Sequence, residues 1–277
     1  MEKDVRRIQL TELEIMIKIK QVCDKYQLRY YLAYGTLLGA IRHEGFIPWD
    51  DDADIWMPAP DYVRFLKVAP KEFGDEFFLQ TVATDPGYHY LFGKVMKNGT
   101  TALALSEKDL NIHWGIYVDV FPLVTYRSED ERKEEDNLTK SIVAFSQAEY
   151  RKMMGSNTTK KLKLIDKIPR FIRRCFSDYF MHKLLDHFDE RNKLIPLAHQ
   201  SLNSRLEFDF SDFIGEKREL LFEGIGFSVP TDAEKVLKQI YGDYLTPPPE
   251  SERLGHERYG TDIIFDCENS YELYKMV

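Results

Sequence analysis

The stretch Pro48-Trp49-Asp50-Asp51-Asp52-Ala53-Asp54-Ile55-Trp56-Met57-Pro58 decides how this sequence folds. Four carboxylates fall within five positions, and their repulsion at neutral pH is costly unless cations or basic groups neutralise it. The acids run into an apolar segment bounded by proline, which is typical of a strand. Alternate residues of an extended chain face the same side, so we expect Asp52 and Asp54 to point together.

A further acid, Asp119, lies in a separate strand-like segment between Val118 and Val120. A lone carboxylate in so apolar a strand is expected to face a cleft. Placed beside Asp54, it would complete a three-carboxylate site made of Asp52, Asp54 and Asp119. Such oxygen ligands suit Mg²⁺, with Mn²⁺ as an alternative, and a site of this kind offsets charge on phosphate oxygens. The pattern predicts a metal-dependent phosphotransferase.

A calcium-binding or merely solvated loop is the competing interpretation of this acid cluster. The flanking residues Trp49, Ile55 and Trp56 are apolar and strand-like, and the glycine of an EF-hand loop is missing. These features favour catalysis. The roles of Asp50 and Asp51 stay open.

Candidate phosphate ligands precede and follow the acid cluster. Gly35 and Thr36 lie between an aromatic strand-like run, 28–34, and a short helix expected at 37–42. They offer backbone N–H groups, a hydroxyl and the positive end of a helix dipole. Arg42 and Lys94 could hold donor phosphates, although an ordinary surface charge is the competing explanation for each.

The wider pattern predicts an α/β (α+β) fold. An amphipathic helix is expected at 8–26 and strands at 77–83, 90–96, 100–105 and 115–121. A charged segment without strand signals follows, and then a strand pair within 220–230 and a capped helix at 231–241. We expect one catalytic unit over 1–277, with a mixed-sheet core at about 1–127 and 200–277 and a mostly helical insertion at about 128–199.

Composition narrows the class of protein. The chain of 277 residues has a net charge of −8, which argues against nucleic-acid binding. No stretch approaches the roughly 18 consecutive apolar residues of a membrane-spanning helix, and the N-terminus has no signal-like apolar run. The three cysteines are far apart and suggest buried, reduced thiols. A cytoplasmic protein is expected.

Three segments resemble the LicD family, the bacterial phosphocholine transferases related to fukutin and fukutin-related protein. The first is Tyr34–Asp54, which contains the run Tyr-Gly-Thr-Leu-Leu-Gly-Ala-Ile-Arg-His. The second is Gly115–Pro122, around Asp119. The third is Tyr241–Pro248, followed by Arg253 and His256. They cover both ends of the chain and leave mainly the expected helical insertion unmatched.

The resemblance implies a nucleotidyltransferase-like core that transfers phosphocholine from CDP-choline to a sugar hydroxyl of a teichoic acid or another cell-surface glycan precursor, with release of CMP. Asp52, Asp54 and Asp119 would then bind metal, and Gly35 and Thr36 would bind phosphate. Arg253 and His256 of the third segment become further substrate-binding candidates. Two alternatives stay open: another CDP-activated donor such as CDP-ribitol or CDP-glycerol, and a non-catalytic metal- or glycan-binding module.

The segment 160–183 alternates basic and apolar residues, which suits a helix lying on an anionic bilayer. Peripheral contact with the inner face of the membrane would match a lipid-linked glycan acceptor. An ordinary helix that covers the core, with solvated Lys and Arg, explains the pattern equally well. Choline would call for an aromatic cage, which the sequence alone does not locate.

Overall fold

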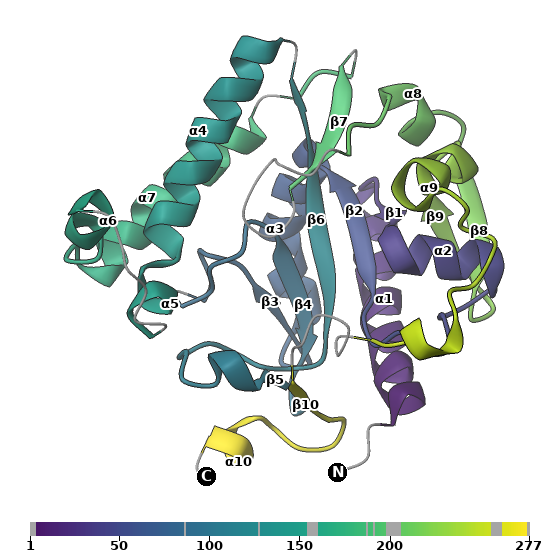
Figure 1. Cartoon of the computed structure of the whole chain (residues 1–277), viewed down its shortest axis with the longest axis horizontal. Helices are drawn as coiled ribbons and strands as arrows, with labels where there is room; N and C mark the ends of the chain where they lie inside the picture. Colours follow the sequence, from purple (N-terminus) through teal and green to yellow (C-terminus); the bar gives the residue numbers. More distant parts are fainter. Residues whose placement is uncertain are drawn as a thin grey trace.

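The computed structural model describes residues 4–85, 87–126, 128–153, 160–186, 188–190, 192–197, 206–255 and 262–275. Figure 1 shows a central sheet with helices packed around it, which confirms the expected α/β fold. The sheet has six strands in the order β1-β2-β6-β4-β3, and β7 also pairs with β6. Only β2 and β6 run parallel, so the sheet is mixed.

Five strands of this sheet overlap expected segments, with different bounds, whereas β7 was not expected. Their bounds are Tyr31–Leu32 for β1, Asp54–Pro58 for β2, Phe77–Gln80 for β3, Gly93–Lys97 for β4, Tyr117–Tyr126 for β6 and Lys193–Pro196 for β7. The aromatic run expected as a strand yields only β1, because helix α2 (Tyr34–Arg42) already begins at Tyr34. Gly35 and Thr36 therefore form the first turn of α2 and not a separate turn before it.

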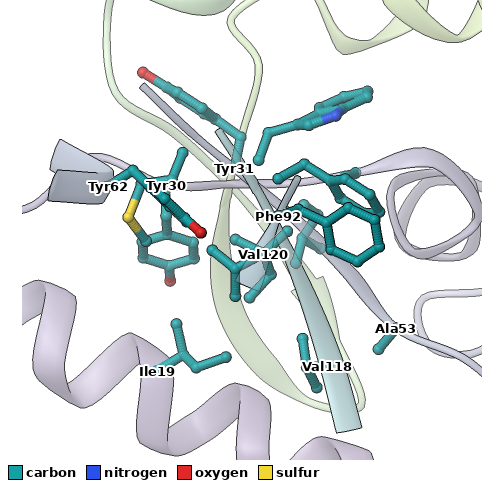
Figure 2. Close-up of a cluster of buried hydrophobic side chains, with 14 of the residues drawn as sticks. Ile19, Tyr30, Tyr31, Ala53, Tyr62, Phe92, Val118 and Val120 are labelled. Carbon is teal, nitrogen blue, oxygen red and sulfur yellow. The ribbon is translucent and has the colours of Figure 1, made fainter. Parts of the chain in front are cut away.

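One face of the sheet is apolar and packs on two helices, α1 (Val5–Tyr26) and α3 (Ala59–Phe73). Ile19 of α1 and Val118 and Val120 of β6 belong to the same buried cluster (Figure 2). Residues i and i+2 of a strand share a face, so Asp119 lies on the opposite face from these valines. The alternation seen in the sequence thus directs the carboxylate away from the main helix-packing face.

Other elements border α2. The hairpin β8 (Arg218–Phe222) and β9 (Ile225–Val229) and the helix α9 (Ala233–Tyr241) were expected, and both contact α2 or β1. The short helix α8 (Phe210–Phe213) packs on α9. Asp232 caps α9 by accepting a hydrogen bond from the N–H of Lys235. In Figure 1 these elements lie together at the right of the sheet.

A helical layer lies at the other side of the sheet, at the left of Figure 1. It contains α4 (Glu129–Ser146), α5 (Ala148–Met153), α6 (Lys160–Ile165) and α7 (Arg170–Leu185). Helices α4 and α7 pack along each other. The expected insertion at 128–199 is thus mostly helical among its described residues, but it also supplies β7, which extends the core sheet beside β6. The division into core and insertion stays a prediction.

Several elements were not predicted from the sequence: α3, β7, α8, β10 and the short helix α10 (Glu272–Lys275). Helix α3 begins directly after β2, and Pro60 lies in its first turn, where proline is favoured because no N–H is needed there. Strand β10 (Ile263–Asp266) pairs with β5 (Thr101–Ala104) in a small antiparallel sheet of its own. A short 3₁₀ turn at Leu105–Glu107 follows β5.

Candidate active site

The two strand acids lie next to each other, as expected. In the parallel pairing of β2 and β6, Asp54 stands directly opposite Asp119. In the antiparallel pairing of β6 and β4, Asp119 stands opposite Lys94. The Lys94 Nζ is 2.6 Å from Asp119 Oδ1. Strand register therefore places two carboxylates and one ammonium side by side across three neighbouring strands.

The remaining acids of the cluster lie in the irregular segment just before β2. Asp52 is half-buried, and Asp51 is almost fully buried. A Cβ atom added at Gly35 would lie 2.7 Å from Asp50 Oδ2, so the Asp50 carboxylate rests against the first turn of α2. A Cβ atom added at Gly255 would collide with Asp51. The segment around Gly255 therefore packs on the acid segment. At Gly35 and at Gly255, the absence of a side chain permits the close approach.

Short polar contacts fix the acid segment. The Thr36 hydroxyl accepts a hydrogen bond of 2.8 Å from the N–H of Asp54, and the N–H of Asp119 donates to the carbonyl of Ala53. The buried Gln9 side chain of α1 donates to the carbonyls of Ile47 and Asp50. Thr36 is only 3% exposed. The observed contact of Thr36 is therefore with the start of β2, and its phosphate-binding role stays a prediction.

The site carries an excess of buried negative charge. Burial raises the pKa of Asp54 well above its usual range, and the nearby carboxylates of Asp52, Asp119 and Asp50 raise it further, while Lys94 lowers it. A carboxyl group in this state accepts a proton or a cation readily. The single positive charge of Lys94 does not neutralise the negative charge of these carboxylates.

Glu12 of α1 belongs to this electrostatic group, although the sequence analysis missed it. It is 2% exposed, and its Oε2 atom has no hydrogen-bond partner in the described part of the chain. Burial raises the pKa of Glu12 well above its usual range, and the nearby carboxylates raise it further. These carboxylates are Asp52, Asp51, Asp50 and Asp54. Its position, four residues from both Ile8 and Met16 on the apolar stripe of α1, was the available signal.

The predicted arginines come together at another border of the site. Arg42 Nη1 donates to the carbonyl of Tyr244 at 2.9 Å, and Arg253 Nε donates to the carbonyl of Pro248 at 3.0 Å. The Arg253 guanidinium lies 5.0 Å from the centre of the Trp49 ring. Burial lowers the pKa of Arg42, and the charge of Arg253 lowers it further. Two cationic groups therefore lie near the acid segment, whereas His256 lies outside the described residues.

Aromatic rings surround the ammonium of Lys94. Its Nζ lies 3.4 Å from the centre of the Tyr117 ring, 5.4 Å from that of Phe92 and 6.0 Å from that of Tyr90. Burial raises the pKa of Tyr117, and the carboxylate of Asp119 raises it further, so this phenol stays protonated. The sequence did not single out these rings. The rings of Tyr117, Phe92 and Tyr90 together form a cation-binding site next to Asp119, which we call the aromatic seat.

The donor set of the carboxylate site, which we define as Asp52, Asp54 and Asp119, consists of oxygen atoms with excess negative charge. Such a set fits a hard divalent cation such as Mg²⁺. Within the described ranges, no three His, Cys, Asp or Glu side chains already stand as a ready group of metal ligands. Metal binding by these three residues stays a prediction, and the raised pKa of Asp54 is the observation that supports it.

Comparisons with known proteins agree with this geometry. Residues 27–153 match the domain described as LicD/FKTN/FKRP, nucleotidyltransferase domain. The lipopolysaccharide cholinephosphotransferase LicD of Haemophilus influenzae is 27% identical over 91% of this chain and 95% of its own length. Uncharacterized proteins of Rickettsia typhi and Rickettsia prowazekii are 33% and 36% identical over 25% and 22% of this chain, and over 25% and 23% of their own lengths. Residues 27–153 of this chain are therefore similar to the LicD-type domain, and this part of the chain includes Asp54, Lys94 and Asp119.

Proposed function

We propose that this protein is a metal-dependent phosphocholine transferase with a nucleotidyltransferase-like core. It moves phosphocholine from CDP-choline to a sugar hydroxyl of a cell-surface glycan, such as a teichoic acid or a lipopolysaccharide, and releases CMP. The observation that carries the proposal is the register of β2 and β6, which sets Asp54 opposite Asp119. The near full-length similarity to a cholinephosphotransferase supports the choice of donor and of acceptor class.

In the proposed reaction, the acceptor oxygen forms a bond to the phosphorus that bears choline, and the bond from that phosphorus to the oxygen of CMP breaks. Asp119 accepts the proton of the acceptor hydroxyl once Lys94, its ion-pair partner, has turned to the donor phosphate. A magnesium ion held by Asp52, Asp54 and Asp119 would offset charge on the phosphate oxygens. Arg42 and Arg253 hold the phosphates or the nucleotide from the Trp49 side.

The aromatic seat supports choline over a polyol donor. A quaternary ammonium has no N–H group and is recognised mainly by ring faces. Tyr117, Phe92 and Tyr90 already surround one cation, the ammonium of Lys94. When Lys94 turns toward the donor phosphate, the same rings become available to the trimethylammonium group. CDP-ribitol and CDP-glycerol would gain little from such a seat.

A donor comparison tests the proposal. The purified protein is incubated with Mg²⁺, an acceptor glycan extract and one of CDP-choline, CDP-ribitol or CDP-glycerol, and CMP release is measured together with incorporation of the label from the donor. We expect CDP-choline to give the highest kcat/KM. Preference for a polyol donor would assign the alternative activity to the same fold, and no turnover with any donor would favour a non-catalytic binding module.

We also propose that the protein is cytoplasmic and that the segment 160–183 contacts the inner face of the membrane, where a lipid-linked acceptor would be found. Leu164, Phe171 and Tyr179 expose 65%, 68% and 61% of their surface among basic residues of α6 and α7. Exposed aromatic side chains beside Lys and Arg are typical of interfacial helices. No helix in the described part of the chain is long and apolar enough to cross a bilayer.

A further inference from the structure

A second charged site lies in the helical layer, away from the acid segment. Helix α7 presents Arg170, Arg173, Arg174 and Ser177 at spacings of three and four residues, which places them on one helix face. This face lines a small cavity that opens to solvent. The other lining residues come from α4 and from the loop between β3 and β4: Val82, Tyr88, Phe145 and Ser146. We call it the arginine cavity.

The polar groups of this cavity are suited to an anion. None of the described lining residues is acidic, and three of them carry a permanent positive charge. Arg173 is only 4% exposed, which is unusual for an arginine. The Ser146 hydroxyl donates weakly, at 3.4 Å, to the carbonyl of His89. The cavity therefore gathers donors and positive charge without a carboxylate on its wall.

Several of the donors are buried and unsatisfied. Arg170 Nε, Ser177 Oγ and Tyr88 Oη have no hydrogen-bond partner in the described part of the chain, and Ser177 and Tyr88 are each 1% exposed. Leaving such a group without a partner destabilises the folded protein, so native proteins seldom do so without a reason. An oxyanion in the cavity would accept hydrogen bonds from the guanidinium, the serine hydroxyl and the tyrosine hydroxyl at once.

We propose that the arginine cavity binds a phosphate-class oxyanion, a phosphomonoester, phosphodiester or diphosphate group. Arginine presents several N–H donors in a fixed planar arrangement that matches the oxygens of phosphate. The cavity also adjoins the first turn of α7, where the helix dipole favours negative charge. Two sources share this chemistry: a phosphate carried by a soluble or acceptor molecule, and the headgroup of an anionic lipid.

The inference rests on the cavity alone and does not depend on the transferase proposal. Burial raises the pKa of Tyr88 well above its usual range, and the carboxylate of Asp119 raises it further, so the Tyr88 hydroxyl stays protonated and can donate to an anion in the cavity.

Calorimetric titration with inorganic phosphate and with pyrophosphate tests the proposal. The titration is made on the full chain in EDTA, so that divalent metal at the carboxylate site cannot hold the anion. We expect saturable binding that weakens at least about tenfold in the double variant Arg170→Gln/Arg174→Gln, because each lost charge-assisted contact is typically that large. Ser177→Ala is expected to weaken binding by a smaller factor.

The matched control is Lys238→Gln, which removes one positive charge from the exposed face of α9. It should bind pyrophosphate as the wild type does, and thermal unfolding of every variant checks that the fold is retained. Absence of saturable binding to the wild type, or equal affinities of wild type and double variant, would overturn the proposal. If Lys238→Gln weakens binding as much as the cavity variants do, the effect comes from net charge and the proposal fails.

A vesicle arm distinguishes the two sources. Sedimentation with phosphatidylglycerol vesicles is compared for the wild type and Arg170→Gln/Arg174→Gln, with and without pyrophosphate. Loss of vesicle binding in the variant, together with displacement by pyrophosphate, supports the site and assigns it to a lipid headgroup. Unchanged vesicle binding beside weakened pyrophosphate binding supports the site and assigns it to a soluble or acceptor-borne phosphate.

Discussion

The carboxylate site and the arginine cavity carry opposite charge and are built in different ways. Three strands hold the first site, because pairing of β2, β6 and β4 sets Asp54, Asp119 and Lys94 in one row. The second depends mainly on one helix, since the turns of α7 stack its arginines and Ser177 on a single face. The positive charge of Lys94 partly neutralises the first site, whereas the described lining residues of the second include no acid.

The difference indicates two kinds of ligand. Excess carboxylate fits a metal and, through it, the phosphates of a donor, whereas a cavity with only donors fits an anion directly. Changes at one site should therefore leave the ligand of the other unaffected. The predictions below test this separation.

Among variants outside the three carboxylates, the largest effect is expected where arginines border the carboxylate site. Arg42→Gln and Arg253→Gln should each raise the KM for CDP-choline about tenfold, because each removes a charge-assisted contact to the donor. Neither change should alter pyrophosphate binding measured in EDTA. Steady-state kinetics and calorimetry on the same preparations check this. An equal loss of pyrophosphate affinity in Arg42→Gln would mean that the two sites are one.

The aromatic seat should discriminate between donors. Tyr117→Leu removes the ring nearest to Lys94 Nζ and is expected to lower kcat/KM for CDP-choline about fivefold, within the usual range of a cation–π contact. Tyr117→Phe keeps the ring face and serves as the matched control. The measurement is kcat/KM for CDP-choline beside CDP-glycerol. A similar loss with CDP-glycerol would show that the ring only supports the fold.

The exposed aromatic residues of α7 should act on membrane binding alone. Phe171→Ser removes a side chain that is 68% exposed and should weaken binding to anionic vesicles about threefold, because only part of the ring can enter the interface. Transfer to a water-soluble acceptor should not change. Vesicle sedimentation and CMP release measure the two effects. Leu221→Ser, which removes a 58% exposed apolar side chain from β8, is the control and should behave as the wild type in the vesicle assay.

The smallest effect is expected from Glu12. Its pKa is raised in the folded protein, while the unfolded chain ionises near the ordinary value of 4.5. Between those two pKa values the native state binds more protons, so its stability falls as pH rises through this window. Glu12→Gln removes this pH-dependent loss of stability. At pH 7 it should raise the free energy of unfolding by about 1 kcal/mol and the Tm by about 2–4 °C.

Below pH 4.5 the advantage of Glu12→Gln should vanish, because Glu12 is then protonated in both states. Calorimetric scans across pH in EDTA measure the difference. Added Mg²⁺ should reduce the gain at pH 7 if the ion neutralises the neighbouring aspartates. A lower Tm for the variant at pH 7 would contradict the proposed electrostatic strain around Glu12.

The pairing of Asp54 with Asp119 could be predicted because each acid interrupts an apolar strand, and a buried charge needs a shared cleft. The structure confirms their adjacency. Asp52 and Asp54 were expected to lie in one extended segment, but β2 begins only at Asp54, because the preceding residues are held by Gln9 and pack against Gly35 and Gly255. Such contacts come from remote parts of the chain, and no local pattern contains them.

The sequence indicates the basic residues of the arginine cavity but not which of them are buried. The basic and apolar alternation of 160–183 is compatible with a membrane-surface helix and equally with an ordinary helix that covers the core, and neither interpretation separates the inward face of α7 from the outward one. Which arginine is buried depends on packing against α4 and the loop around Tyr88. Strand β10 was missed for a related reason, since its partner β5 lies far earlier in the chain.

The most direct test of the central claim is CMP release from CDP-choline, measured for the wild type and for Asp119→Asn with Mg²⁺ and an acceptor glycan extract. Asp52→Asn and added EDTA extend the test to the metal. We predict metal-dependent release by the wild type and at least about a 100-fold loss in Asp119→Asn, with the fold and cavity binding of pyrophosphate retained. Release that is unchanged in Asp119→Asn or insensitive to EDTA would contradict transfer at the carboxylate site.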